Sequence, residues 1–561
     1  MPESFAAIYF AVARWLLPLT GVTLFWLLTY AFFRGKQKSD PKAYLKTQDG
    51  EYLPLYYPEN LLGSGKSCDI DLPCRTARKR HALLTLREDG GFCLTDTQSG
   101  ETQTYTLGES FETGGVRFTF ARQIPEIFSS SAAAPRRKKK KPKKVKAQPF
   151  GAALGMLLIF QILAGAEVTL NMGEKYRLSA VICFAVLPAT AAAVALLTRK
   201  ITGSPPHIEL AVFFLLTVGF AVTASASPVS LYKQLAAAVL GMAMYLAALP
   251  ALRFGLKNPD SLGKNSNANP SLWMWLRYMA AGLTVLLLVL TKICGTVSNG
   301  ARLWINLGFV TVQPSEFAKI FFVFALALPA RWLSKKRGLL FSGGLTAVCM
   351  TLLASVSDFG GVLVLFLTFL VTVYLSFGAF PAAVLGAGSV LGGAGVVLTQ
   401  TYVRNRFQAW GHVFLEKFVD GQGYQQSRTL IVIAGGGLLG LGAGKGMLRG
   451  IFAADTDLVF GLICEEWGFI IGLCAVFGIL LLLYPAVFGG SFSSKVQFTA
   501  AAAATGCMFL FQTALNVFGS TDILPLTGVT VPFISNGGSS MVTCWIMLAF
   551  IKNAAYNRIE N

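Results

Sequence analysis

The chain has 561 residues, of which 54% are hydrophobic and only 14% are charged, and its mean hydropathy is +0.56. A soluble protein of this size needs more polar residues to cover its surface, so the composition excludes a soluble globular protein and indicates a membrane protein. The net charge is +20, and the ten cysteines show neither paired nor metal-like spacing, which argues against a disulfide framework and against a metal site.

The first predicted element is a membrane anchor within residues 1–35. Its apolar stretch is too long for a signal-peptide core, and no convincing cleavage site follows it. The basic cluster after it places the next residues in the cytoplasm and the N-terminus outside, because Lys and Arg are enriched in cytoplasmic loops. Residues 40–122 contain short alternating runs separated by Gly, Asp and Ser, which predicts a small cytosolic all-β sandwich.

A Ser/Ala/Pro linker is predicted over residues 123–149. It ends in a basic tract, RRKKKKPKKVK at 136–146. Because the tract lies between a cytosolic domain and a span, it favours contact with anionic membrane lipids over a nucleic-acid-binding arm. We therefore expect membrane lipids and no nucleic acid as its partner.

From Gly151 onward, length and hydropathy predict about twelve more spans. They lie near residues 151–171, 178–198, 208–228, 231–252, 273–293, 316–333, 338–356, 359–377, 380–399, 458–486, 497–520 and 534–552. About thirteen transmembrane helices result, with the C-terminus inside. Two of them form an additional segment over residues 150–200. Basic clusters at 198–200, 253–257 and 334–338 fall on the predicted cytoplasmic side, which supports the topology.

Asp358 lies in SVSDFGGVLVLF, at the predicted outer junction of two spans. An ionisable group is costly there and usually faces a cavity, and the Gly pair after it lets another backbone or a ligand approach closely. The same residue could instead cap the next helix by accepting bonds from the N–H groups at its start. The residues alone leave both interpretations open.

The segment over residues 299–320 carries Arg302, Trp304, Glu316 and Lys319. We expect it to be a re-entrant or interfacial piece. Its spacing favours an interfacial anchor, with Trp304 in the aromatic belt and Glu316 paired with Lys319 at i, i+3.

A long loop is predicted on the outer side, over residues 400–457. It is rich in cations, against the cytoplasmic bias for Lys and Arg, and an anionic ligand outside would explain them. The cations are Arg404, Arg406, Lys417, Arg428, Lys445 and Arg449. The Gly-rich stretch that ends in Lys445 and Arg449 could wrap a pyrophosphate, although it is not a Walker motif.

Acidic residues also gather around the start of the next span. Asp457 precedes the span, and Glu465 and Glu466 lie about two turns inside it, where acids are rare. Helix capping and buried, hydrogen-bonded carboxyls are the favoured interpretation. Near the end of the chain, Ser539 and Ser540 lie at the mouth of the last span, where small residues permit either tight helix contact or hydrogen bonds to a headgroup.

These segments, in this order, resemble the SEDS family (shape, elongation, division and sporulation; the RodA and FtsW type) over roughly residues 205–555. Five segments carry the resemblance: GARLWINLGFVTVQPSEFAKI, SDFGG, YVRNRF followed by GYQQS, TDLVFGLICEEWGFIIG and LPLTGVTVPFISNGGSS. The resemblance implies a polytopic α-helical protein of the bacterial cytoplasmic membrane, with a family core of about ten spans.

The same resemblance implies a peptidoglycan glycosyltransferase that polymerises lipid II at the outer face of the membrane, for division, elongation or sporulation, beside a class B penicillin-binding protein. Asp358 matches the family's essential aspartate. That match implies a general base that takes the proton from the acceptor sugar 4-hydroxyl during inverting attack on the lipid-linked donor. The pyrophosphate leaving group needs cationic partners, to which a divalent cation, Mg²⁺ or Mn²⁺, could be added; no organic cofactor is expected.

The residues expected to bind the substrate are Arg302, Trp304, Glu316, Lys319, Arg404, Arg406, Gln425, Lys445, Asp457, Ser539 and Ser540. The chain departs from the family pattern at Ser357 and Phe359, where Pro and Leu are usual, and at Asn536, where Tyr is usual. An Arg commonly precedes the Trp, whereas this chain has Leu303.

Residues 60–120 resemble a forkhead-associated (FHA) domain through LLGSGKSCDIDL, RKRHALLTL and FCLTDTQSG. Such domains usually read phosphothreonine with an Arg after the first Gly, a Ser before the Arg-x-His stretch and a later Asn-Gly. Here those places hold Ser64, Arg78 and no Asn-Gly, while His81 fits the structural position. A phosphoprotein reader, an interaction domain of altered specificity and a purely structural domain all stay open.

Transport is the alternative function. Many spans, membrane carboxylates and Gly-interrupted segments also describe a lipid II flippase or another transporter of lipid-linked substrates. The spans show no evident inverted repeat, and the polar residues gather at the predicted outer face rather than at the midplane. These two observations favour the polymerase.

Overall fold

The computed structural model describes residues 3–34, 43–121, 150–255, 270–327, 335–488 and 496–556, apart from gaps at 49–51, 56–58, 65–67, 73–77, 79–80, 87–90, 98, 100, 107, 114, 299–300 and 309. The described residues form two units, a helical bundle and a small β-domain. The predicted linker over residues 123–149 lies outside them.

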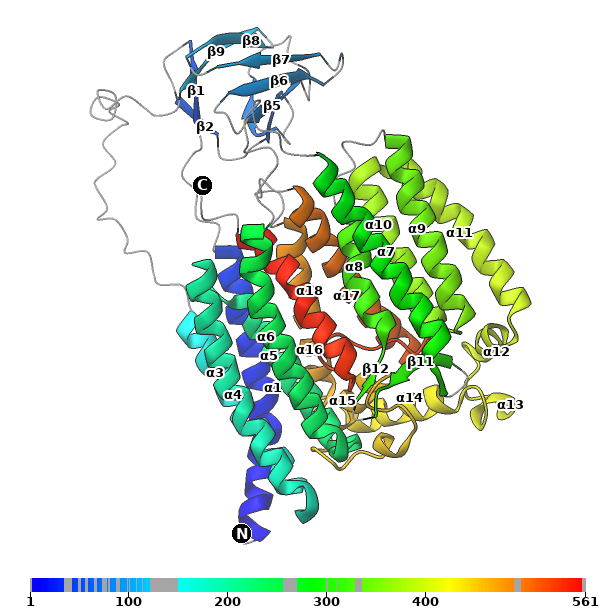
Figure 1. Ribbon diagram of the computed structural model, residues 1–561. Helices are drawn as coiled ribbons and strands as arrows, with labels where there is room; N and C mark the ends of the chain where they lie inside the picture. Colours follow the sequence, from blue (N-terminus) through cyan, green and yellow to red (C-terminus); the bar gives the residue numbers. More distant parts are fainter. Residues whose placement is uncertain are drawn as a thin grey trace, which may run out of the picture. The chain divides into compact units, whose positions relative to one another are not determined.

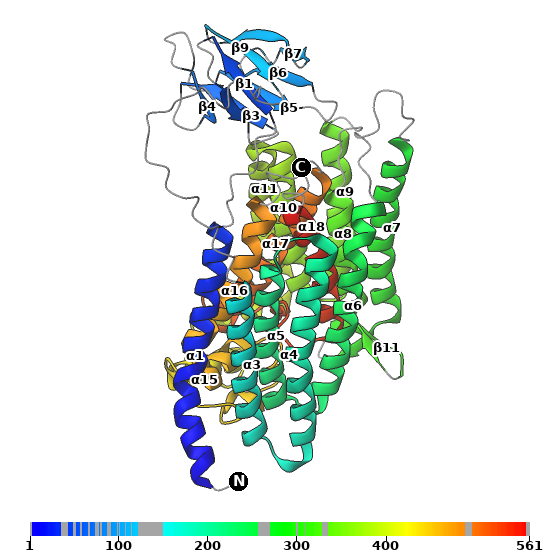
Figure 2. The same ribbon diagram turned by 90° about the vertical axis from the view of Figure 1, so that its left-hand side faces the viewer.

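The bundle consists of long apolar helices that run side by side (Figures 1 and 2). They are α1 (Glu3–Arg34), α3 (Phe150–Asn171), α4 (Glu174–Thr202), α5 (His207–Ala226), α6 (Leu231–Gly255), α7 (Pro270–Cys294), α8 (Pro314–Ala327), α9 (Lys335–Ser355), α10 (Phe359–Phe377), α11 (Ala379–Thr399), α16 (Phe469–Phe488), α17 (Val496–Ser520) and α18 (Gly538–Tyr556), with a 3₁₀ turn, η1 (Pro228–Ser230), before α6.

Eleven helices of the described residues are long and apolar enough to cross a membrane, against the roughly thirteen that hydropathy predicts. The other two predicted spans correspond to α8 and α18. These helices form where they were expected, with 14 and 19 residues, but they are not among the eleven. The prediction of a polytopic helical protein is confirmed.

Helix α5 lies at the centre of the bundle, packed against α3, α4 and α16. In its most apolar window 94% of the residues are buried, whereas none is buried in that of α11. A buried ion pair ties this centre together: Glu209 of α5 contacts Lys552 of α18 at 3.1 Å and accepts the hydroxyl of Tyr245 of α6. Paired and hydrogen-bonded in this way, the buried charges avoid the large cost of isolation.

One end of the bundle, which we call the hairpin end, carries the start of α8 and of α10 and a small antiparallel sheet (Figure 1). The sheet contains β10 (Thr296–Ser298), β11 (Ala301–Asn306) and β12 (Thr311–Val312), in the order β10-β11-β12. Of the segment that we expected to be re-entrant or interfacial, the part before Pro314 thus contributes β11 and β12 to this sheet, and the part from Pro314 onward begins α8.

The long connection after α11 is also structured at the hairpin end. It holds α12 (Thr401–Ala409), α13 (Glu416–Val419), α14 (Tyr424–Gly436), η3 (Leu448–Gly450) and α15 (Val459–Trp467). The predicted single span over 458–486 is wrong, because the helix breaks at Gly468 into α15 and α16. Gly468 has φ +87°, and a Cβ there would lie 2.3 Å from the Leu438 carbonyl oxygen, so a close backbone approach causes the break.

The β-domain is a two-sheet sandwich, as predicted. Its strands are β1 (Ala43–Thr47), β2 (Tyr52–Leu55), β3 (Glu59–Gly63), β4 (Ile70–Asp71), β5 (Ala82–Leu86), β6 (Phe92–Asp96), β7 (Thr102–Tyr105), β8 (Ser110–Thr113) and β9 (Val116–Ala121). The sheets have the orders β2-β1-β9-β8 and β4-β3-β5-β6-β7. Alternate side chains point inward, and Phe92 stacks on Phe120 with ring centroids 3.7 Å apart, which joins the two sheets.

Candidate active site

Asp358 lies at the hairpin end, directly before α10. Its Oδ1 accepts the N–H of Gly361 at 2.7 Å, so the helix-cap interpretation is confirmed. The side chain is half-buried, and within the described residues its Oδ2 forms no hydrogen bond. Capping therefore uses one carboxylate oxygen and leaves the other for chemistry.

A buried ion pair in the first two turns of α8 lies near enough to Asp358 to act on its charge. Lys319 Nζ donates to Glu316 Oε1 at 2.6 Å, which confirms the predicted i, i+3 pair, and both residues are buried. Burial raises the pKa of Asp358 above its ordinary value; the Gly361 N–H and the Lys319 charge lower this pKa, and the Glu316 charge raises it. The pair therefore acts electrostatically on the candidate base.

The loop between α17 and α18, residues 521–537, is called here the final loop. Its backbone passes against the start of α10: a Cβ on Gly360 would lie 2.8 Å from the Thr527 carbonyl oxygen and 2.7 Å from Val529 Cγ2. The sequence predicted that the Gly pair after Asp358 would allow such an approach. On the α17 side, Asn516 Nδ2 donates to the Val529 carbonyl at 2.7 Å.

The final loop also contacts the turn before α15. Asn516 Nδ2 donates to the Asp457 carbonyl at 3.0 Å, and a Cβ on Gly528 would lie 3.3 Å from Asp457 Oδ2. Burial raises the pKa of Asp457 to about 6, and the nearby Arg406 guanidinium lowers it. Arg406 itself donates to the Leu526 carbonyl. The loop thus lies between Asp358 on one side and the Asp457–Arg406 pair on the other.

The start of α18 completes this cluster. Ser539 Oγ accepts the N–H of Gln313 at 3.0 Å, and Ser540 Oγ lies 3.4 Å from Thr530 Oγ1 in the final loop. Both serines are buried. Small hydroxyl side chains therefore join α18 to the residue before α8 and to the final loop.

Other predicted residues lie around or away from this cluster. Arg302 is exposed on β11, and its backbone N–H donates to the Val356 carbonyl at 3.3 Å, two residues before Asp358; Trp304 lies on the same strand. Arg404 is exposed on α12. Gln425 donates to the Phe452 carbonyl at 2.9 Å.

The Gly-rich stretch that ends in Lys445 and Arg449 is folded around two carboxylates. Glu465 accepts the N–H groups of Met447 at 2.6 Å and Leu448 at 3.0 Å, and Glu466 accepts that of Gly446 at 3.3 Å. This confirms the interpretation of the Glu pair as buried, hydrogen-bonded carboxyls. These backbone donors are consequently engaged by protein and are not directed at a pyrophosphate.

Sequence reasoning missed two residues that connect the cluster. Asn516 links the final loop to the turn before α15, and Gln313 contacts Ser539. Asn516 had a readable signal, because an amide inside an apolar span is costly unless it is hydrogen-bonded. Gln313 lies within the motif GARLWINLGFVTVQPSEFAKI, but no periodicity of the sequence distinguishes it from its neighbours.

Two family models match the chain. Residues 262–560 match the FTSW_RODA_SPOVE family, described as cell cycle protein, and residues 60–111 match the FHA domain. Among curated proteins, the chain is 32% identical to the peptidoglycan glycosyltransferase RodA of Mycobacterium tuberculosis (strain ATCC 25618 / H37Rv) over 287 residues, which cover 46% of this chain and 58% of the relative.

The chain is also 28% identical to the stage V sporulation protein E of Bacillus subtilis (strain 168), over 52% of this chain and 82% of the relative. A chain in a solved structure described as "structural coordination of polymerization and crosslinking by a peptidoglycan synthase complex" aligns with a TM-score of 0.51 and 25% identity, covering 63% of this chain and 98% of that one. The chain therefore spans nearly all of that solved chain but 58% of the mycobacterial relative.

The close approach at Gly360 generates a stability prediction. We expect Gly360→Ala to lower the melting temperature of the purified protein, because the new methyl group overlaps the Thr527 carbonyl oxygen. Gly388→Ala in α11 is the matched control: nothing lies within 4 Å of its Cβ, so the replacement gains about 0.5–1 kcal/mol from helix propensity. Thermal unfolding in detergent measures both, and a Gly360→Ala protein as stable as the Gly388→Ala protein would contradict the described packing.

Proposed function

This chain belongs to the FtsW, RodA and SpoVE family, and we propose that it is a peptidoglycan glycosyltransferase that polymerises lipid II with Asp358 as the general base. The observation that carries the proposal is the half-buried Asp358 carboxylate, with one oxygen fixed by Gly361 and the other not hydrogen-bonded to the described residues. It stands beside the buried Lys319–Glu316 pair.

The proposed reaction follows from that geometry. The carboxylate takes the proton from the acceptor sugar 4-hydroxyl while that oxygen bonds to the anomeric carbon of the lipid-linked donor. The bond from the anomeric carbon to the phosphate oxygen breaks, and undecaprenyl pyrophosphate leaves with the electron pair. One displacement of this kind inverts the anomeric carbon.

Cations near the carboxylate would stabilise the leaving pyrophosphate. We assign this role to Lys319, whose charge acts on Asp358, and to Arg406, which donates to the Leu526 carbonyl of the final loop. The exposed Arg404 on α12 is the third cation of this set. Arg302, Trp304, Gln425, Ser539 and Ser540 are proposed to hold the sugar and peptide parts. Lys445 is left out of this set, because it lines a separate cavity.

A divalent cation is proposed only as a companion of the pyrophosphate. Among the described residues, no three His, Cys, Asp or Glu side chains converge as a metal cage would require. Mg²⁺ is commonly held by substrate phosphates with one or two carboxylates. Asp358 and Asp457 are the candidates here, because the third carboxylate of the cluster, Glu316, is paired with Lys319. The cation would neutralise charge on the leaving group.

For the topology we propose that the hairpin end faces the outside, with the FHA-like domain and the C-terminus in the cytoplasm. The basic clusters at 198–200, 253–257 and 334–338 support this orientation. A class B penicillin-binding protein is the proposed partner, because the similar solved chain belongs to a peptidoglycan synthase complex that couples polymerization to crosslinking.

Replacing Asp358 tests the catalytic assignment. With purified protein and lipid II, alone and with the partner, we expect Asp358→Asn and Asp358→Ala to lower the rate of glycan polymerisation about 10²–10⁴-fold, since a positioned base contributes that much. Asp420→Asn, which removes an exposed carboxylate from the long loop, should keep the wild-type rate. Undiminished polymer from Asp358→Ala would exclude Asp358 as the base, and lipid movement without polymer would favour a flippase.

Neutralising one or the other residue of the ion pair beside Asp358 is expected to shift the pH profile of polymerisation in opposite directions. Polymerisation requires ionised Asp358, so the rate falls as pH drops through a pKa that burial has raised. Lys319→Gln removes a charge that lowers this pKa and should move the acid limb upward by about one pH unit; Glu316→Gln should move it downward by about as much. A purely structural role would change the rates and leave both limbs in place.

For the FHA-like domain we propose a phosphoprotein partner. Arg78 pairs with Asp96 at 3.4 Å, and both side chains are substantially exposed. An exposed ion pair of this kind contributes little to stability, so a phosphate group can replace Asp96 as the partner of the guanidinium. The backbone carbonyl of Arg78 accepts the Ser64 N–H at 2.9 Å, which holds the two recognition segments together.

We expect phosphothreonine peptides to bind the full-length protein and to lose about tenfold in affinity on Arg78→Ala, the usual effect of one charge-assisted contact. Arg117→Ala is the control, because Arg117 forms a comparable exposed pair with Glu112 on the other sheet. Fluorescence anisotropy with phosphorylated and unphosphorylated peptides measures the effect. Equal binding of both peptides would leave the domain a structural or altered-specificity role.

A further inference from the structure

A cavity of about 130 Å³ lies at a junction that the proposed reaction does not use. Its walls come from α1, α3, the Gly-rich stretch and the end of α15. Helices α1 and α3 both precede residues 262–560, the part that matches the family. The cavity is therefore built in large part from helices that this chain adds to the family core.

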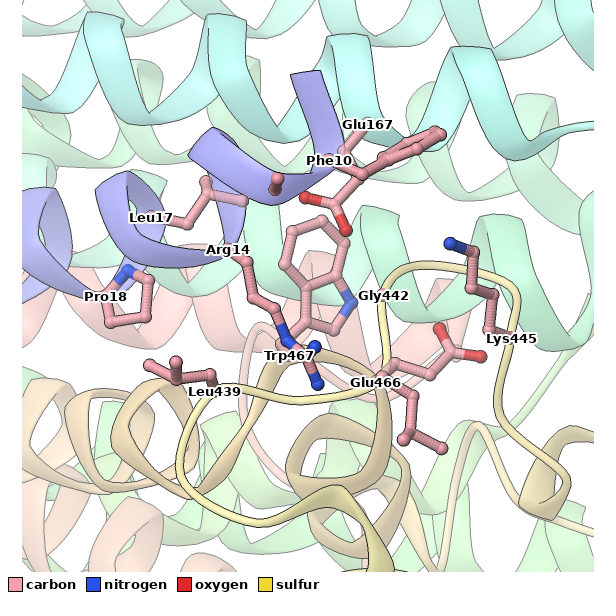
Figure 3. A pocket seen from close by; sticks show the side chains of 12 residues that line it. Phe10, Arg14, Leu17, Pro18, Glu167, Leu439, Gly442, Lys445, Glu466 and Trp467 are labelled. Carbon is pink, nitrogen blue, oxygen red and sulfur yellow. The ribbon is translucent and has the colours of Figure 1, made fainter. Parts of the chain in front are cut away.

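Charged and aromatic side chains converge on this cavity, as Figure 3 shows for Arg14, Glu167, Lys445, Glu466 and Trp467. Arg14 donates to the Gly440 carbonyl, and Lys445 Nζ lies 4.5 Å from the centre of the Phe10 ring. Among the described residues, neither cation forms an ion pair with a carboxylate. Both are exposed at the mouth of the cavity.

Two polar atoms in the lining have no hydrogen-bond partner among the described residues. The Trp467 Nε1 donor and the Glu466 Oε2 acceptor are buried without a hydrogen bond, in side chains that are 3% and 1% exposed. The other oxygen, Oε1 of Glu466, accepts Ser225 Oγ and the Gly446 N–H. A buried donor and a buried acceptor left unsatisfied are costly. Because these two line the same cavity, a single occupant with one acceptor and one donor could satisfy both.

We propose that this cavity binds the headgroup of a zwitterionic phospholipid whose ammonium group carries N–H donors. The phosphate would accept from Arg14, Lys445 and the Trp467 indole N–H, and the ammonium would donate to Glu466 Oε2. The lining carries two cations, Arg14 and Lys445, beside two carboxyl groups, Glu167 and Glu466, so it offers partners to both halves of a zwitterion, whereas an anion would use only the cations.

Depth and size agree with a lipid headgroup. Arg14 lies five residues inside the span that begins at Tyr9, roughly 8 Å along the helix axis, so it is within reach of headgroups by snorkelling. The cavity is well below the roughly 300–1,000 Å³ of pockets that hold drug-sized ligands. It therefore suits a small polar group whose acyl chains remain outside.

The test compares two zwitterionic lipids, of which one has three N–H donors on its ammonium group and the other has three methyl groups in their place. Full-length protein is purified from a mixture of phosphatidylethanolamine, phosphatidylcholine and phosphatidylglycerol, and the retained lipids are quantified by mass spectrometry. We expect phosphatidylethanolamine to be enriched about tenfold over phosphatidylcholine, which has the same phosphate and charge but no N–H donor.

The variants separate the two halves of the headgroup. Glu466→Gln, whose amide oxygen still accepts Ser225 and Gly446, should abolish the preference for phosphatidylethanolamine. Trp467→Phe and Arg14→Gln should lower retention of both zwitterionic lipids and leave their ratio unchanged. Trp545→Phe is the matched control, because it removes an equally buried and unpartnered indole N–H outside the cavity, and it should change neither quantity.

Four results would overturn the proposal. They are equal retention of phosphatidylethanolamine and phosphatidylcholine, preferential retention of phosphatidylglycerol, displacement of the lipid by millimolar inorganic phosphate, and no lipid above its share in the mixture. The last of these results would indicate that the cavity holds only water. An unchanged preference in a well-folded Glu466→Gln protein would likewise remove the carboxylate from the site.

Discussion

The candidate active site depends on how closely the final loop approaches the start of α10. The loop backbone meets α10 at Gly360, where any side chain would overlap the Thr527 carbonyl oxygen, and it meets the turn before α15 through Asn516. Asp358 and Asp457 belong to segments about a hundred residues apart in the chain. They become parts of one cluster because a single loop is hydrogen-bonded or packed against both.

Several carboxylates of the bundle accept hydrogen bonds from backbone N–H groups, and the cost of removing a charge from water explains why. A carboxylate removed from water needs donors, and the ends of helices supply N–H groups that have no partner inside the helix. Asp358 takes one of them at Gly361, while Glu465 takes two from the turn that ends the Gly-rich stretch. Capping and catalysis are therefore compatible at Asp358, since the cap engages one oxygen and fixes the direction of the other.

Hydropathy and length located the spans well, because burial in lipid imposes a length and composition that can be read residue by residue. They failed at Gly468, where a long-range contact with Leu438, invisible in local composition, breaks one predicted span into two helices.

Of the site, Asp358 and the Glu316–Lys319 pair could be predicted from cost and spacing. The position of Lys445 could not, because it depends on how α1 and α3 pack. At Ser357 the structure explains a departure from the family pattern: its φ is +65°, which the Pro usual at that place cannot adopt.

The helices that precede the family-matched segment contact the core at its least regular part. Arg14 of α1 donates to the Gly440 carbonyl, and Glu167 of α3 accepts the Ala443 N–H at 3.1 Å. That stretch is fixed in turn by the carboxylates at the end of α15, and α15 begins two residues after Asp457. Nine residues of helix span about 13 Å, so one short, fully buried helix separates the lipid cavity from the candidate active site.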